Sequence, residues 1–302
     1  MSPAGEFSHQ GSAPQPEPFQ AQTPIRAGYA PTSGETEWAR LDAMHIGITQ
    51  FIDGRLTPAP IENSNPRRIL ELGAGSGAWA IQAAQQFPEA EVIASDINPL
   101  PSRPLPPNMR FERADLTQPL PFAPASFDIV HLRLVLCHIP HGHTLLPRLA
   151  ALVAPGGWLL IDDGNMPTWA LTGDNDGGAP NMRRCIEGYD AYMRANEQDP
   201  AIAESLVGYL RALREKCGFG EVWAARTDFL INDALPDPAQ QRLSEILRES
   251  MRRIYTNSMA PAVRAYGITP EAQRGYIEEA GGTEWRARLT LLVTWTQKAV
   301  EA

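Results

Sequence analysis

An apolar run that leads into a glycine-spaced loop constrains this chain most. Residues 68–80 read Arg-Ile-Leu-Glu-Leu-Gly-Ala-Gly-Ser-Gly-Ala-Trp-Ala, which places glycine at 73, 75 and 77. This order predicts a strand, a tight turn and a helix. Because glycine lacks a Cβ atom, backbone N–H groups in such a turn can approach a ligand closely. The helix that follows presents the positive end of its dipole, so the loop is the expected centre of a binding site.

Short apolar strands separated by helical connections follow the loop. The predicted strands are residues 91–96, 109–115, 126–132 and 157–163, with two more at 221–231 and 285–295. Strands that alternate with helices form βαβ crossovers and a mostly parallel sheet covered on both faces. Past residue 163, glycine and proline are frequent, which predicts a long loop that carries Trp169. We therefore predict an α/β fold.

The chain is expected to form one domain behind an N-terminal arm. Residues 1–34 are rich in proline and glutamine and poor in large aliphatic side chains, so they cannot bury enough apolar surface to become ordered. Residues 35–302 are assigned to the domain. Its parts are a lid helix at 35–57, a cofactor-binding core at 66–163, a helical cap at 164–217, and C-terminal strands and helices at 218–302.

The lid helix is predicted to be amphipathic. Its apolar residues recur three and four positions apart: Trp38, Leu41, His45, Ile48 and Ile52. Its charged residues fall off that line: Glu37, Arg40, Asp42 and Asp53. This period predicts a helix that buries the apolar stripe. Two roles stay open for His45: a core histidine on this stripe, or part of a lid over a ligand together with Tyr29.

Composition argues against several classes of partner. The chain has 302 residues and a formal net charge of -9, and its basic residues are scattered, so we expect no nucleic-acid partner. Three cysteines at 137, 185 and 217 are too few and too far apart for a disulfide framework or a cysteine-based zinc site. No metal site is predicted. Without a long apolar window or a signal-peptide pattern, we expect a soluble protein of the cytoplasm that does not enter the membrane. A nuclear location and homo-oligomerisation are left open.

The glycine loop alone is compatible with two cofactors. Gly73, Gly75 and Ala78 also satisfy the dinucleotide-binding fingerprint, whose last glycine can be alanine. Asp96 ends the second predicted strand, 96 − 77 = 19 residues past Gly77. A carboxylate at this place suits the ribose diol of either cofactor, because it can accept both hydroxyl protons.

The other strand ends resemble those of class I S-adenosylmethionine-dependent methyltransferases. Five stretches match in the same order: Glu71-x-Gly73-x-Gly75-x-Gly77, Asp96, Ala114-Asp115-Leu116, Ser126-Phe127-Asp128-Ile129-Val130 and Leu152-x-x-Pro155-Gly156-Gly157-x-Leu159. The resemblance covers residues 66–163. It implies a Rossmann-like sheet of seven mostly parallel strands in the order 3-2-1-4-5-7-6, with the last strand antiparallel. Helices on both faces, a helical cap and S-adenosyl-L-methionine as cofactor are also implied.

The same resemblance implies the site residues. The glycine loop cradles the methionine part of the cofactor, Asp96 holds the ribose, and Asp115 with Leu116 forms the adenine site. The full set of implied cofactor-binding residues is Tyr29, Glu71, Gly73, Ala74, Gly75, Gly77, Asp96, Ile97, Asp115, Leu116, His131 and Arg133. Histidine is the natural base near neutral pH, and His138 lies where the fourth strand gives way to the pocket rim. We treat His138 as the candidate base or substrate contact.

A second, narrower resemblance lies before the core. Tyr29-x-Pro31, Glu35 and Arg40-Leu41-Asp42-x-x-His45 are similar to the lead-in of fungal methyltransferases of secondary metabolism, including velvet-associated regulators.

Apolar and aromatic residues predict the lining of the acceptor site. The candidates are Trp169, Met182, Tyr189 and Met193. The hypothesis is methyl transfer to oxygen or nitrogen of a hydrophobic small molecule, a secondary metabolite. The alternatives are a methyltransferase-like regulator that acts through protein partners, and an NAD(P)-dependent oxidoreductase.

Overall fold

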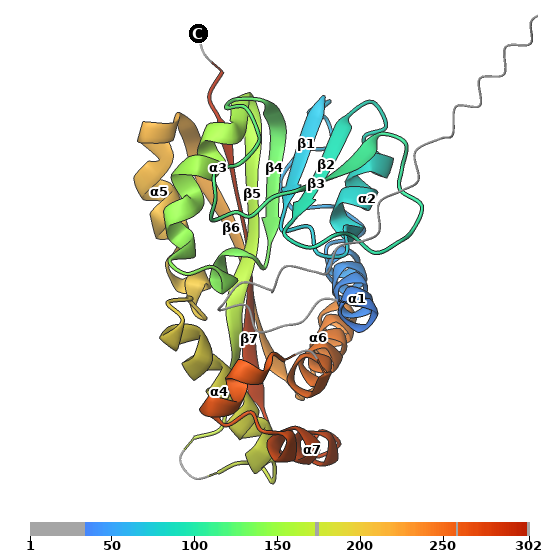
Figure 1. Cartoon of the computed structure of the whole chain (residues 1–302), viewed down its shortest axis with the longest axis vertical. Coiled ribbons are helices and arrows are strands. Elements are labelled where there is room, and N and C mark those ends of the chain that lie inside the picture. Colours follow the sequence, from blue (N-terminus) through green and yellow to red (C-terminus); the bar gives the residue numbers. More distant parts are fainter. Residues whose placement is uncertain (1–33, 173–174, 258, 301–302) are drawn as a thin grey trace, which may run out of the picture.

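The apolar run before the glycine loop forms an inner strand of a seven-stranded sheet (Figure 1). In the computed structural model, which describes residues 34–172, 175–257 and 259–300, β1 (Arg68–Leu72) pairs in parallel with β2 (Glu91–Asp96) and β4 (Phe127–Arg133). Four of the five β1 residues are buried, because a strand inside a parallel sheet is covered on both faces.

The strand order confirms the predicted fold class. β3 (Met109–Arg113) lies beyond β2, and β5 (Val153–Trp169) lies beyond β4, both in parallel. The other edge is a hairpin-like pair, β7 (Ala287–Lys298) and β6 (Phe219–Ile231), in which β7 runs antiparallel to both β5 and β6. The order is therefore β3-β2-β1-β4-β5-β7-β6, as the resemblance implied.

Neighbouring residues of β1 face opposite sides of the sheet, and helices cover both. Ile69 packs in one apolar cluster with Trp79 and Ala80 of α2 (Ala78–Gln86). Leu70 packs in the other cluster with Leu146 and Leu149 of α3 (Leu146–Leu152). The side-chain period of two along a strand thus divides the core into two layers. α5 (Leu206–Cys217) lies against β6 on the α3 side (Figure 1).

Further helices gather beyond the carboxyl ends of the parallel strands (Figure 1). α1 (Glu35–Phe51) packs against α6 (Pro238–Asn257), and α4 (Pro180–Ala195) packs against α7 (Pro270–Glu279). Four 3-10 turns join these parts: η1 (Leu136–His138), η2 (Gly142–Leu145), η3 (Ile202–Glu204) and η4 (Pro261–Tyr266). None of the helices in the described ranges is long and apolar enough to cross a membrane.

The fifth strand is longer than predicted. The expected loop after residue 163 is wrong in its first part, because β5 continues to Trp169 and pairs with β7 as far as Ala287. The long antiparallel partner supplies hydrogen bonds that the local sequence does not reveal. Pro167 lies inside the irregularity in the pairing between Asn165 and Thr168, where a residue without an N–H group is tolerated.

The first helix buries charged residues that the amphipathic pattern leaves outside its apolar stripe. Glu37 and Arg40 are only 5% and 7% exposed, because they pair with each other and face α6. The predicted stripe is half right: Trp38, Leu41 and His45 are half-buried and face a cavity. The predicted arm at 1–34 lies outside the described residues, apart from Gly34.

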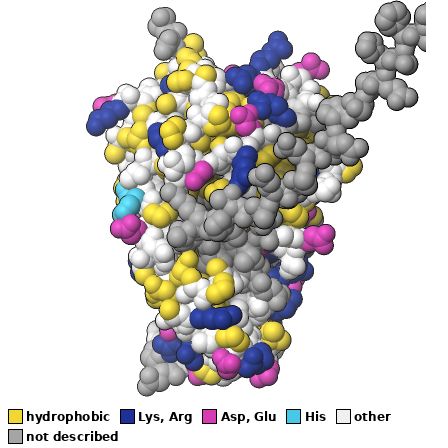
Figure 2. All heavy atoms as spheres, in the orientation of Figure 1, with side chains coloured by type: hydrophobic (Ala, Val, Ile, Leu, Met, Phe, Trp, Pro, Cys, Tyr) yellow, Lys and Arg dark blue, Asp and Glu magenta, His cyan; other side chains and the backbone are white. Residues whose placement is uncertain are grey.

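The surface mixes charges of both signs. On the face drawn in Figure 2, basic side chains lie among acidic ones, and the described part of this face carries no continuous basic stripe. Several charged residues of the described chain pair within one helix, for example Arg183 with Glu187 at 2.8 Å and Arg252 with Glu249 at 2.6 Å. Such exposed pairs contribute little to stability.

Candidate active site

A cavity of about 290 Å³ opens where the carboxyl ends of the parallel strands meet α1 and α6. This is the edge at which α/β sheets bind ligands. The structure brings most of the predicted site residues together around it: Glu71, Gly73, Ala74, Gly75, Asp96, Ile97, Asp115, Leu116, Arg133 and His138. Gly77 and His131 are not among the lining residues, and Tyr29 lies outside the described residues.

The glycine loop depends on glycine for its backbone and for its packing. Gly73, Gly75 and Gly77 have φ angles of 70°, 57° and 75°, in the left-handed region that side chains rarely adopt. A Cβ atom at Gly73 would lie 2.4 Å from Val135 Cγ2, and one at Gly75 would lie 2.8 Å from Leu41 Cδ1. Gly77 is the N-cap residue of α2 and does not line the cavity.

Asp96 joins the end of β2 to the glycine loop. Its Oδ2 atom accepts a hydrogen bond from Gly75 N at 2.8 Å, and its Oδ1 atom accepts one from Asn98 N at 2.9 Å. Burial raises the pKa of this carboxyl group above its usual value, although these two bonds act in the opposite direction. A buried carboxylate with lone pairs still available favours hydroxyl donors, which a ribose diol supplies.

The loop after β3 is ordered by its own acid. Asp115 Oδ1 accepts hydrogen bonds from the backbone N–H of Thr117 at 2.8 Å and from its hydroxyl at 2.6 Å. This turn places Asp115 and Leu116 at the same cavity as Asp96. Their contact with adenine stays a prediction.

Glu71 and His131 form the buried base of the site. Glu71 Oε2 accepts a hydrogen bond from Ala80 N in the first turn of α2 at 3.0 Å. His131 is fully buried and stacks on Trp79 with ring centroids 3.8 Å apart. The side chain of His131 does not line the cavity, because this stacking holds the ring against Trp79, which does. A contact of His131 with the cofactor, through its backbone or its side chain, stays a prediction. Its Nε2 atom lies 3.5 Å from Asp162 Oδ2.

Arg133 brings a positive charge to the cavity wall near the glycine loop. Its Nε and Nη2 atoms donate to Asp162 Oδ2 at 2.9 and 2.8 Å, and its Nη1 atom lies 3.2 Å from His45 Nδ1. Burial, followed by the charge of Arg133, lowers the pKa of His45 to about 4. His45 is therefore neutral at neutral pH, and its Nδ1 atom can accept a hydrogen bond from Arg133. It lines the cavity rather than the core.

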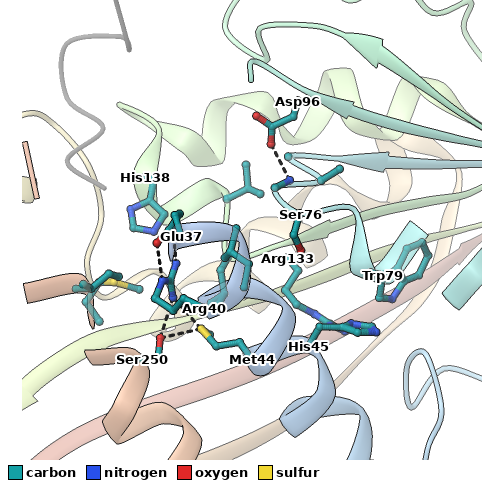
Figure 3. A pocket seen from close by; sticks show the side chains of 18 of the residues that line it. Glu37, Arg40, Met44, His45, Ser76, Trp79, Asp96, Arg133, His138 and Ser250 are labelled. Atoms are coloured by element: carbon teal, nitrogen blue, oxygen red, sulfur yellow. Dashed lines mark hydrogen bonds and ion pairs between the residues drawn. The ribbon is translucent and has the colours of Figure 1, made fainter. Parts of the chain in front are cut away.

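His138 lies in η1, opposite α1 (Figure 3). Burial, followed by the charge of Arg40, lowers the pKa of this histidine to about 4. Its backbone oxygen accepts a hydrogen bond from Gln198 Nε2 at 2.6 Å, which fixes the turn. The side chain can contact a ligand in the cavity, but with this pKa it is a weak base at neutral pH.

The far end of the cavity is built by residues that the sequence pattern did not connect. Of the four predicted acceptor-site residues, only Tyr189 lines the cavity, while Met182 and Met193 are buried in the core. The lining comes instead from one face of α6 and from the β5 and β7 strands: Leu247, Ser250, Met251, Ile254, Tyr255, Asn165, Met166, Leu289 and Leu291. The apolar period of α6 was visible, but its partner α1 lies about 200 residues earlier and could not be deduced.

The model of the methyltransferase domain family matches residues 45–196. Methyltransferase str2 of Strobilurus tenacellus is 43% identical over 262 residues, which cover 86% of this chain and 91% of that protein. The chain belongs to the methyltransferase family. Methyltransferase str3 of the same fungus is 42% identical over 292 residues, 93% of this chain and 98% of that protein.

The family assignment decides between the two cofactors that the glycine loop left open. This methyltransferase is S-adenosylmethionine-dependent, as the order of its strand-end motifs implied. The likeness to the regulators is more limited. Secondary metabolism regulator laeA of Coprinopsis cinerea is 31% identical over 144 residues, which cover 46% of this methyltransferase and 36% of that protein.

Proposed function

We propose that this methyltransferase transfers a methyl group to an oxygen or nitrogen atom of a hydrophobic small molecule, a secondary metabolite. One observation carries the proposal: a single cavity extends from the glycine loop and Asp96 to an apolar end lined by α6 and β7. Small-molecule sites are typically apolar cavities with a few polar groups that fix orientation. The full-length fungal relatives are methyltransferases by name, which supports the reaction and leaves the acceptor open.

The described residues fit S-adenosylmethionine at the other end of the cavity. In this proposal Asp96 binds the ribose diol, and Asp115 with Leu116 binds adenine; all three residues line the cavity. Glu71, Asp96 and Asp115 bring three carboxylates to this end, against the one guanidinium of Arg133, which is already paired with Asp162. An acidic environment stabilises a ligand that carries a sulfonium and an ammonium group. Gly73 and Gly75 line this end of the cavity, so their backbone is open to the methionine tail of the cofactor.

The chain needs mainly to align the acceptor and exclude water. When bound, the cofactor supplies an activated methyl group, so the displacement does not require a nucleophile from the protein. The neutral state of His138 lets it accept a hydrogen bond from an acceptor hydroxyl or amine. We propose that it positions the acceptor and is not a strong base. Such a site suits a methyl acceptor that needs no strong base: either a group that is already an anion at neutral pH, or an uncharged group that is nucleophilic without losing a proton.

An acceptor screen tests the proposal. The purified chain is incubated with methyl-labelled S-adenosylmethionine below saturation and a panel of hydrophobic phenols, enols, carboxylic acids and amines, with a protein-free reaction as the background and Asp96→Ala as the weakened variant. Turnover of at least one class, reduced in Asp96→Ala, supports the enzyme. Binding of S-adenosylhomocysteine without turnover of any class, together with co-purification of a protein partner, would support the regulator instead. In that case we would abandon the small-molecule acceptor.

A further inference from the structure

The acceptor end of the cavity contains a buried ion pair on α1. Arg40 Nε donates to Glu37 Oε2 at 2.8 Å, and Arg40 Nη2 donates to Glu37 Oε1 at 2.5 Å (Figure 3). Both residues line the cavity, and both are less than a tenth exposed. The two-point contact fixes the plane of the guanidinium and leaves its Nη1 atom directed toward α6.

Two strong hydrogen-bond donors, Arg40 Nη1 and Ser250 Oγ, both point to the sulfur of Met44, which is a weak acceptor. Arg40 Nη1 donates to Ser250 Oγ at 2.8 Å and lies 2.9 Å from Met44 Sδ, and Ser250 Oγ lies 3.0 Å from the same sulfur (Figure 3). Ser250 accepts from Arg40, so its own hydrogen is directed to Met44. A thioether sulfur accepts hydrogen bonds only weakly. Donors held in a buried wall by a poor partner gain free energy when an oxygen atom takes its place.

Met44 is suited to move. Methionine is unbranched and has three rotatable side-chain bonds, so it can repack at low cost. It lines the same cavity as Leu247, Met251 and Ile254 of α6 and Tyr189 of α4. This apolar lining can hold the body of a hydrophobic molecule while the sulfur position is exchanged for an oxygen.

The charge balance selects the kind of oxygen. Glu37 already neutralises Arg40 at contact distance, so the pair carries no net charge. An anion at the sulfur position would bring an uncompensated negative charge into a buried wall that contains the Glu37 carboxylate, which is costly. A carbonyl oxygen of a ketone, ester or amide can accept both hydrogen bonds without that cost.

We propose that Arg40 and Ser250 form a subsite for an uncharged carbonyl oxygen of the acceptor molecule, and that Met44 moves aside when this oxygen binds. The proposal rests on the small-molecule function proposed above. It adds a positioning role: the carbonyl group is held at α1 and α6, so the opposite end of the molecule is presented toward the cofactor residues.

Three naphthalene ligands of similar size test the subsite. In the presence of saturating S-adenosylhomocysteine, binding of 2-acetylnaphthalene, 2-ethylnaphthalene and 2-naphthoate is measured by fluorescence titration. These compounds place a carbonyl, a methylene group and a carboxylate at the same position. We expect the acetyl compound to bind about tenfold more tightly than the ethyl compound, the value of one to two net hydrogen bonds. The carboxylate should bind more weakly than the acetyl compound.

Variants locate the effect. Ser250→Ala should reduce the preference for acetyl over ethyl to about threefold or less, because one donor is lost. Met44→Leu keeps the side-chain volume and removes the competing sulfur, so it should maintain or increase the preference. Ser244→Ala is the matched control: Ser244 is buried on the same helix but is not a lining residue of the cavity, so the preference should be unchanged. Thermal unfolding and S-adenosylhomocysteine titration of each variant establish that it is folded.

The wild-type comparison stands even if a variant fails to fold. Equal binding of the acetyl and ethyl compounds, or binding of neither, would overturn the subsite. Tightest binding of 2-naphthoate would show that Arg40 acts as an anion site, and this also overturns the proposal. A failure of the proposed function is read separately, as absent S-adenosylhomocysteine binding or absent turnover in the acceptor screen.

Discussion

Replacement of Asp96 by alanine should weaken cofactor binding more than any other single removal of a carboxylate in this site. Asp96 makes the bond that ties the end of β2 to the glycine loop, through Gly75 N at 2.8 Å, and it lines the cavity. Alanine removes this bond and the proposed acceptors for both ribose hydroxyls. The substitution therefore acts on the loop and on the ligand together.

The magnitude follows from the bonds that are lost. A charge-assisted hydrogen bond contributes about 1.5–3 kcal/mol, and part of this is regained when water enters the space of the carboxylate. We expect a loss of about 1–3 kcal/mol, which corresponds to a rise of about 5- to 150-fold in the dissociation constant. Asp96→Asn keeps one acceptor oxygen, so its effect should be smaller.

The sign of the pH dependence adds a second test. Burial raises the pKa of Asp96, so the free protein favours the protonated carboxyl group at a higher pH than an exposed aspartate does. Ribose hydroxyls favour the ionised carboxylate, which can accept both hydrogen bonds. Binding should therefore strengthen as pH rises through the pKa of Asp96, with release of a proton, and Asp96→Asn should lose this dependence.

Isothermal titration with S-adenosylhomocysteine measures the affinity of Asp96→Ala, the affinity of Asp96→Asn and the pH dependence of binding. Glu89→Ala is the matched control, because Glu89 is an exposed carboxylate in the turn before β2 and does not line the cavity. Thermal unfolding of each variant separates loss of the site from loss of the fold. An affinity of Asp96→Ala within twofold of the wild type would refute the placement of the ribose.

Three further predictions concern the loop, a buried acid and the histidine of η1. Gly75→Ala, with φ of 57° and its new Cβ atom 2.8 Å from Leu41 Cδ1, should lower both the free energy of unfolding and the affinity for S-adenosylhomocysteine by at least about 1 kcal/mol. The control Gly218→Ala, at φ of 71° outside the cavity, should lower only the free energy of unfolding. An unchanged affinity of Gly75→Ala would count against the loop as the cofactor cradle. Burial raises the pKa of Asp163 to about 6, so its contribution to stability is present below the unfolded pKa and is lost as pH rises through about 6. Relative to Asp163→Asn, the free energy of unfolding of the wild type should fall by about 3 kcal/mol between pH 3.5 and 7, and parallel pH curves of the two proteins in urea denaturation would contradict this. His138→Gln should leave the shape of the kcat profile between pH 6 and 8 unchanged, since the pKa of His138 is about 4; disappearance of an inflection in this range would identify His138 as the titrating base.

Local constraints explain how much of the site could be predicted. The glycines at 73, 75 and 77 occupy left-handed backbone conformations, so the residue type at each position already indicates the turn. Asp96 is the last residue of an apolar strand, so its place at the sheet edge could be predicted from the sequence. Parallel strands bring their carboxyl ends to one edge, so the matching motifs had to meet there. The strand order came from the resemblance and not from the periodicity, which does not specify which strands pair.

Pairing between distant segments explains the errors. The first part of the loop predicted after residue 163 is a strand, as far as Trp169, because β7, more than a hundred residues later, provides its hydrogen bonds. The ring of His131 stacks on Trp79 and is absent from the cavity lining, which the local sequence did not indicate. In each case the local residues are compatible with two structures, and a partner elsewhere in the chain selects one.

The apolar end of the cavity was determined by tertiary structure alone. The sequence indicated the donor, because a glycine loop, a ribose acid and ordered strand ends are local motifs with recognisable backbone requirements. The proposed acceptor subsite depends on Arg40 and Ser250, which are 210 residues apart and meet because α1 packs on α6. Burial of a charged side chain is favourable only when its partners are in place, and no periodicity along one helix records where those partners lie.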